Sequence, residues 1–160
     1  MFVYKIRAAL PQDLEGVYQV FLLSDNLHRQ AHPEIFQNSF DPKSTKGYLL
    51  STIKSEDAVV LVAEYRGEII GGLLAWIRHT LYSPALVPQT YLNIDNLVVT
   101  QEFRRQGIGR APMEHIQHWS EERGIEQIQL TVWGFNQAAH EFYKNLGYLT
   151  LHYLMRKDLT

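Results

Sequence analysis

The chain has 160 residues, of which 46% are hydrophobic and 20% charged, and its 15 Lys and Arg against 17 Asp and Glu give a formal net charge of -2. This length suits one domain, and so much apolar content with so little net charge excludes an intrinsically disordered chain. The composition gives no basic excess to indicate a nucleic-acid partner, and the absence of cysteine excludes disulfides, thiolate metal sites and a cysteine nucleophile.

The sequence predicts neither a targeting segment nor a division into parts. Its first residues lack an apolar core of signal-peptide length, and no run of about 18 uncharged apolar residues occurs. No repeat, low-complexity tract or Pro/Gly/Ser-rich linker interrupts it. We therefore predict a single domain over residues 1–160, located in the cytoplasm and without a membrane partner.

The first half of the chain predicts three strands and two helices. In chain order these are a strand over 3–7, a helix opened by 11–13, a polar stretch over 28–41, a helix over 42–54 with Leu49 and Ile53 on its buried side, a strand over 58–65, and its hairpin partner over 69–78. The hairpin partner carries Gly71 and Gly72, where a bulge or a close backbone approach is expected.

The second half alternates strands with helices. The predicted elements are a strand over 91–100, a helix over 108–123, a strand over 127–132, a helix over 136–146 and a strand over 148–155. Both helices carry one apolar face that suits packing on a sheet. The fold class is therefore mixed α/β, with a sheet covered by helices.

The segment from Val98 to Arg110 has the properties of an anion site. A strand runs into a glycine-containing turn that opens a helix, where free backbone amides point outward. Gly107 and Gly109 leave room for a phosphate, and Pro112 is tolerable because it falls in the first helical turn. Three arginines add positive charge: Arg104, Arg105 and Arg110.

Two familiar phosphate motifs do not match this turn. The dinucleotide fingerprint needs glycine at position 112, which is Pro112, and the nucleotide P-loop needs Gly-Lys-Ser/Thr. A plain helix start with exposed arginines remains the alternative.

In the second informative segment, over 131–148, Asn136 is a suitable helix N-cap and Gly147 a suitable C-terminal residue, with Tyr143 two turns along the helix from Asn136. Taken alone, the Phe142-Tyr143 pair is typical of core packing.

Together the two segments resemble the GNAT superfamily of acyl-CoA-dependent N-acetyltransferases. Arg104-x-x-Gly107-x-Gly109 matches the pyrophosphate loop of that family, and Asn136-x-x-Ala139-x-x-Phe142-Tyr143-x-x-x-Gly147-Tyr148 matches its other signature. The specific part covers roughly residues 91–148. The resemblance implies the GNAT acyl-CoA N-acyltransferase fold, an α/β fold with a mixed central sheet of six to seven strands flanked by about four helices.

By this resemblance acetyl-CoA is the cosubstrate, with its pyrophosphate on the loop and its pantetheine arm paired with the strand before the loop like an added strand. A main-chain amide near Val98 is expected to polarise the acetyl carbonyl, and Tyr143 to lie near the sulfur. The expected cofactor-binding residues are Leu97, Val98, Val99, Arg104, Arg105, Gln106, Gly107, Ile108, Gly109, Arg110, Asn136 and Tyr143.

The implied reaction is direct acetyl transfer to a primary amine in a ternary complex. An alkylamine with a pKa of about 10.4 must first lose a proton, and a thiolate leaving group with a pKa of about 8.5 benefits from a proton donor. Tyr143 is the expected donor. Asp95 is the best candidate for the base, with His79 and Glu64 as alternatives, although a strand-end carboxylate can equally bind the amine or serve only structure.

The identity of the acceptor is left open. The resemblance places its site at residues 26–48 and 79–90, which allows a small molecule, a peptide or a protein amine, and it is compatible with a homodimer. No metal is expected, because the His28/His32 and His115/His118 pairs lack an evident third ligand. An acyl-CoA sensor without turnover and a protein-interaction module are the rival functions.

Overall fold

The computed structural model describes residues 3–37 and 41–159. It divides the chain into two compact units, Met1–Leu130 and Thr131–Thr160, which are described separately. The first unit holds a five-stranded sheet in the order β1-β2-β3-β4-β5. Its strands are β1 (Lys5–Ala8), β2 (Ala58–Tyr65), β3 (Glu68–His79), β4 (Thr90–Val99) and β5 (Ile128–Leu130), and its helices are α1 (Leu14–Ala31), α2 (Pro42–Ile53) and α3 (Arg110–Glu121).

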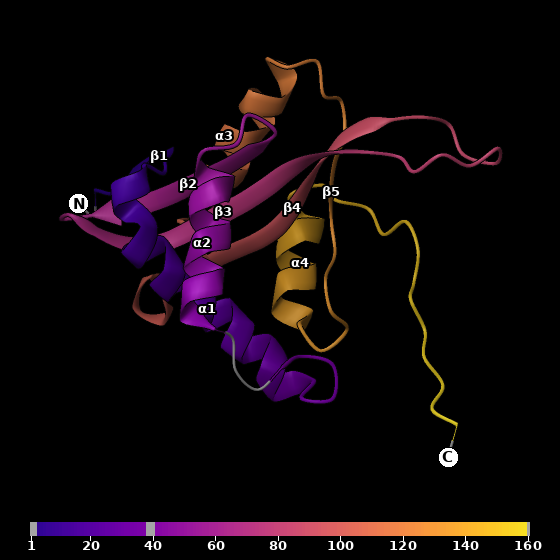
Figure 1. The fold of residues 1–160 in the computed structure, drawn as a ribbon, viewed down its shortest axis with the longest axis horizontal. Helices are drawn as coiled ribbons and strands as arrows, with labels where there is room; N and C mark the ends of the chain where they lie inside the picture. The colour runs from indigo at the N-terminus through magenta and orange to yellow at the C-terminus, as the bar shows by residue number, and fades with distance from the viewer. Residues whose placement is uncertain (1–2, 38–40, 160) are drawn as a thin grey trace. The chain divides into compact units, whose positions relative to one another are not determined.

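Helices cover both faces of this sheet (Figure 1). On one face α1 and α2 pack against β2, β3 and β4, because α1 buries Val17, Tyr18 and Phe21 on one side. On the other face α3 lies against β1 and β2, and Ile108 joins a smaller apolar cluster there. The predicted mixed α/β fold, with a sheet covered by helices, is confirmed.

The predicted close approach at the paired glycines is confirmed. In β3, Gly71 and Gly72 lie opposite Val99 and Val98 of β4. A Cβ added at Gly71 would stand 2.9 Å from the carbonyl oxygen of Val98, and one at Gly72 would stand 2.9 Å from the Phe21 ring. Glycine therefore lets β4 and α1 approach β3 closely.

Gly71→Ala is expected to destabilise the fold by about 1–3 kcal/mol, because a backbone carbonyl cannot move aside as a flexible side chain can. Urea unfolding measures this directly. Gly47→Ala is the control, since Gly47 is exposed in α2 and a Cβ there meets nothing within 4 Å. This control should be as stable as wild type or more stable, because alanine favours a helix over glycine. An unchanged unfolding free energy in Gly71→Ala would show that β4 has room to shift.

The strand β4 separates from its parallel neighbour β5. The two strands pair only where Leu92, Asn93 and Ile94 face Ile128–Leu130. Beyond Ile94, the edge of β4 that faces away from β3 has no strand beside it within the described residues. The pairing with β3 also slips by one residue, since Leu74 faces Asn96 whereas Ala75 faces Ile94, so Asp95 forms a bulge in β4.

The second unit contains α4 (Gln137–Asn145), and both of its predicted ends are confirmed. The Asn136 Oδ1 accepts a hydrogen bond from the Ala139 amide at 3.1 Å, which caps the N-terminus. Gly147 follows the helix with a φ of +90°, the left-handed conformation that favours glycine.

Two predictions about regular structure were wrong. The helix α1 continues through Ala31, where a broken polar stretch was expected from residue 28, because polar residues on an exposed helical face do not interrupt a helix. Residues 148–155 form no strand, and Leu149, Leu151 and Leu154 are 85%, 77% and 94% exposed. Alternating side chains favour a strand only where another strand edge accepts its backbone hydrogen bonds, so the described residues form five strands instead of six to seven.

Candidate active site

Along the open edge of β4, backbone groups have no strand partner among the described residues. The Leu92 amide donates to the Gln127 carbonyl on the β5 side, and the Thr100 amide donates to the Ile70 carbonyl on the β3 side. Alternation from Thr100 back to the bulge directs the Val98 amide to β3 and the amides of Leu97 and Val99 to the open edge. The edge therefore offers two outward amides over 97–99, and the Val98 amide is not one of them.

The loop after β4 is held by side-chain hydrogen bonds, one of which joins it to the end of β4. The Arg104 Nε donates to the Val99 carbonyl oxygen at 2.9 Å, and the Gln106 amide nitrogen donates to the Glu102 carbonyl at 3.2 Å. Arg104, Arg105 and Gln106 are exposed. Arg104 thus orders the loop while its remaining guanidinium donors stay available, a structural role that the sequence did not predict.

The loop then turns into α3, and no described side chain covers its backbone at Gly107. Arg105 and Gly107 have φ angles of 61° and 82°, and a Cβ added at Gly107 would meet nothing within 4 Å. Gly109 is the N-cap of α3 and Arg110 its first residue, two positions later than the predicted start, while Ile108 is buried beneath the turn. An open turn with left-handed residues before a helix N-terminus is suited to bind an anion.

In the second unit, Tyr143 is a phenol held in its neutral form. Its ring lies edge-on to those of Phe142 and Tyr148, with centroids 5.2 and 5.7 Å away. Burial, together with the neighbouring Tyr148, raises the pKa of Tyr143 above its usual range. Burial also raises the pKa of Tyr148 to about 12. Both side chains therefore retain a proton at neutral pH.

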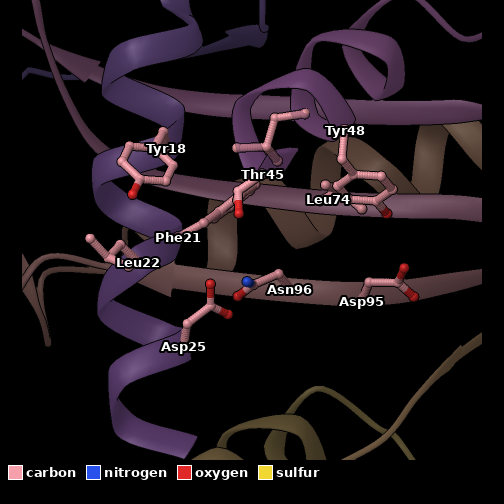
Figure 2. Close-up of a pocket in the computed structure, with 10 residues that line it drawn as sticks. Tyr18, Phe21, Leu22, Asp25, Thr45, Tyr48, Leu74, Asp95 and Asn96 are labelled. Carbon is pink, nitrogen blue, oxygen red and sulfur yellow. The ribbon is translucent and has the colours of Figure 1, made fainter. Parts of the chain in front are cut away.

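A pocket of about 130 Å³ lies in the first unit between α1, α2 and the strands β3 and β4 (Figure 2). Its walls combine aromatic, aliphatic and polar side chains. They are Tyr18, Phe21, Leu22 and Asp25 from α1, Thr45, Tyr48 and Leu49 from α2, Leu74 from β3, and Asp95 and Asn96 from β4. Two of these residues are carboxylates that come from different elements.

Asp95 is the predicted base that lines this pocket, and it does so from the bulge in β4. Its Oδ1 accepts a hydrogen bond from the Asn93 side chain at 2.5 Å, and its Oδ2 lies 3.7 Å from the Arg78 guanidinium. The bulge thus turns a carboxylate of the strand towards the pocket, two residues before the outward amide of Leu97.

The two alternative bases do not line the pocket. The Glu64 carboxylate accepts from the Arg7 Nε at 2.7 Å, and the His79 ring lies 3.0 Å from the Thr90 hydroxyl. No residue of the 79–90 loop contributes to the pocket walls. From the predicted acceptor range 26–48 the pocket takes Thr45 and Tyr48, and residues 38–40 of that range lie outside the described residues.

Neither a metal cluster nor a membrane span is found among the residues that the structure describes. Over 3–37 and 41–159, no group of three or more His, Asp or Glu residues is arranged to hold a metal ion. No described helix is long and apolar enough to cross a membrane.

Comparison with known families decides the assignment. The model of the acetyltransferase (GNAT) family matches residues 24–148, which is most of the chain. The protein belongs to the GNAT family. The match includes both the loop before α3 and the helix α4, the two segments on which the resemblance rested.

Characterised relatives match only part of this GNAT chain. The [ribosomal protein bS18]-alanine N-acetyltransferase of Escherichia coli is 40% identical over 53 residues, which are 33% of this chain and 36% of that enzyme. The chain therefore aligns with about a third of the length of that relative. An uncharacterized N-acetyltransferase of Bacillus subtilis, YhfO, is 22% identical over 89% of this chain and 88% of its own.

Solved structures match this GNAT chain over nearly its whole length. A single-residue mutant of the BH1408 protein from Bacillus halodurans has a TM-score of 0.88 and 26% identity, and the match covers 98% of this chain and 99% of that one. The aminoglycoside N-acetyltransferase AAC(6')-Iy, solved in complex with CoA, has a TM-score of 0.78 over 99% of this chain and 96% of its own. At 16% identity the second match shows the fold alone.

Sequence reasoning missed the pocket residues of this GNAT protein that lie on α1. Tyr18, Phe21, Leu22 and Asp25 are spaced by three, one and three residues, so they share one face of the helix. An acidic residue that continues an apolar helical face was a visible signal for Asp25. Its partners on β4 were not visible, because about 70 residues separate them from α1 in the chain.

Proposed function

We propose that this protein is an acetyl-CoA-dependent N-acetyltransferase that acetylates a primary amine bound in the pocket between α1, α2 and β4. The observation that carries the proposal is the open edge of β4 after Ile94, which has outward amides beside a pocket with two carboxylates, in a chain of the GNAT family. We further propose that its two units work as one acetyltransferase domain in the cytoplasm.

The residues present fit acetyl-CoA. The outward amides of Leu97 and Val99 suit the amide-containing pantetheine arm, since an open strand edge binds amides as it binds a peptide. The uncovered turn at Gly107 and the α3 N-terminus suit the pyrophosphate, with basic side chains around them. The loop residues proposed to bind it are Arg104, Arg105, Gln106, Gly107, Ile108, Gly109 and Arg110, and Asn136 is proposed to bind the arm through its side-chain amide nitrogen.

Bound acetyl-CoA supplies an activated acetyl thioester. Groups of this protein polarise its carbonyl, bind the amine and transfer protons. We assign the polarising role expected near Val98 to the Leu97 amide, because the strand register directs that amide outward. Asp95 holds the acceptor amine and takes up its proton, directly or through water. Tyr143, which retains its proton at neutral pH, donates it to the leaving sulfur.

The test combines calorimetric titration with CoA and a free-thiol assay with acetyl-CoA. We expect CoA binding and thiol release with at least one amine from a panel of polyamines, amino acids, aminoglycosides and peptides. A peptide with N-terminal alanine and an aminoglycoside belong in the panel because proteins named for such acceptors are similar to this chain. Binding without thiol release from any amine would favour an acyl-CoA sensor, and failure to bind CoA would refute the cofactor assignment.

A further inference from the structure

The pocket is acidic and small. None of its described lining residues is Lys or Arg, whereas Asp25 and Asp95 both contribute carboxylates. Its volume of about 130 Å³ is well below the roughly 300–1,000 Å³ of sites for drug-sized ligands. Such a cavity suits an alkyl chain that carries positive charge better than it suits a bulky or an anionic group.

The Asp25 carboxylate is half-buried without a compensating hydrogen bond from the described residues. Burial raises its pKa, and the nearby side chains of His28 and Arg29 only partly oppose that rise. Asp95, in contrast, already has Asn93 and Arg78 beside it. The described side chains therefore compensate the charge of Asp25 only in part, and a cation bound in the pocket would complete that compensation.

The two carboxylates stand at separate places along the pocket. Figure 2 shows the Asp25 side chain reaching from α1 towards β4, with Asn96 between it and Asp95. Asp95 lies at the bulge and is the proposed base, so the amino group to be acetylated is assigned to Asp95. Asp25 contributes from α1, on the other side of Asn96 from Asp95, and the aromatic rings of Tyr18 and Tyr48 also line the pocket.

We propose that Asp25 selects acceptors with two positive charges: a short aliphatic diamine places one amino group beside Asp95 for acetylation and binds its second ammonium group at Asp25. This proposal rests on the proposed function, since it uses the same pocket. The Tyr48 ring favours a cation over a neutral chain end, because aromatic faces attract positive charge, whereas the Tyr18 ring already has the Lys46 Nζ 4.8 Å from its centroid. Asp25 is thus a specificity-determining residue and takes no part in proton transfer.

The test compares two probes that differ by one amino group, 1,5-diaminopentane and 1-aminopentane. Each is titrated by calorimetry into the full chain saturated with CoA, so binding is measured without turnover. We expect the wild-type protein to bind the diamine at least tenfold more tightly than the monoamine. In Asp25→Asn the two dissociation constants should fall within about twofold of each other, through weaker binding of the diamine.

Asp57→Asn is the matched control, because it removes the same charge from an exposed carboxylate outside the pocket and should retain the tenfold preference. Asp25→Asn should unfold at the same urea concentration as wild type or higher, because it removes a carboxylate that burial disfavours. Asp25→Glu, which keeps the charge, should restore part of the preference.

Equal affinities in the wild-type protein, undetectable diamine binding, or an unchanged preference in Asp25→Asn would each overturn the proposal. A diamine preference that depends on Asp25, found together with no thiol release from acetyl-CoA, would support the second-cation site and refute the proposed acetyl transfer. The two proposals therefore fail on different measurements.

Discussion

Gly107→Asp is expected to raise the dissociation constant for CoA by one to two orders of magnitude. The turn at Gly107 is uncovered, and its φ of 82° is one that residues with a side chain rarely adopt. A carboxylate there would stand where a phosphate is proposed to bind, and like charges held close together repel strongly. Calorimetric titration of CoA measures the effect, with each tenfold loss equal to about 1.4 kcal/mol.

Two further variants separate charge from backbone strain. Gly124→Asp adds the same charge at an exposed glycine with a φ of 68°, on the turn after α3, and should leave CoA affinity within about twofold. Gly107→Ala adds strain without charge and should have a smaller effect than Gly107→Asp. CoA binding by Gly107→Asp within about twofold of wild type would refute the pyrophosphate assignment.

The arginines of the loop are expected to contribute less than the glycine turn. Arg105→Ala removes an exposed charge whose attraction is screened by salt, so its effect on CoA affinity should fade as ionic strength rises. Arg104→Ala also removes the hydrogen bond to the Val99 carbonyl, so part of its effect should persist at high salt.

Tyr143→Phe is expected to lower turnover by about 10- to 1000-fold while acetyl-CoA affinity stays within a few-fold. The change removes one oxygen and keeps the ring packed against Phe142 and Tyr148. If the hydroxyl protonates the leaving thiolate, the loss falls within the usual range for a general acid and appears in kcat and kcat/KM alike. Steady-state free-thiol kinetics with a proven acceptor, combined with calorimetry, measure both quantities.

Tyr148→Phe is the matched control for this change. Tyr148 is also a phenol whose pKa is raised by burial, and its ring contacts that of Tyr143, but it has no assigned proton transfer. Its loss should leave kcat within about threefold. Wild-type kcat in Tyr143→Phe, with chemistry shown to limit the rate, would refute the acid role and leave the family assignment unaffected.

Local patterns predicted most of the fold because their causes are local. The strand over 58–65 and the start of α2 at Pro42 lie where they were expected. The cap by Asn136 and the left-handed Gly147 also follow from chemistry within a few residues of each position. The prediction at 148–155 was wrong because a strand depends on a partner that its own residues do not supply.

The sequence alone determined the family and the glycine-containing turn before α3, because both depend on short spacings within one segment. It also determined which residue types are available for proton transfer, since these are read directly from the chain. Only the tertiary structure decided which backbone amides face the open edge of β4, since that depends on pairing with β3 and on the bulge at Asp95. It also decided which carboxylates share a pocket: Asp25 and Asp95 line the same pocket because α1 packs across β3 and β4. Helix packing and strand register are set by contacts between distant parts of the chain, and no local pattern records them.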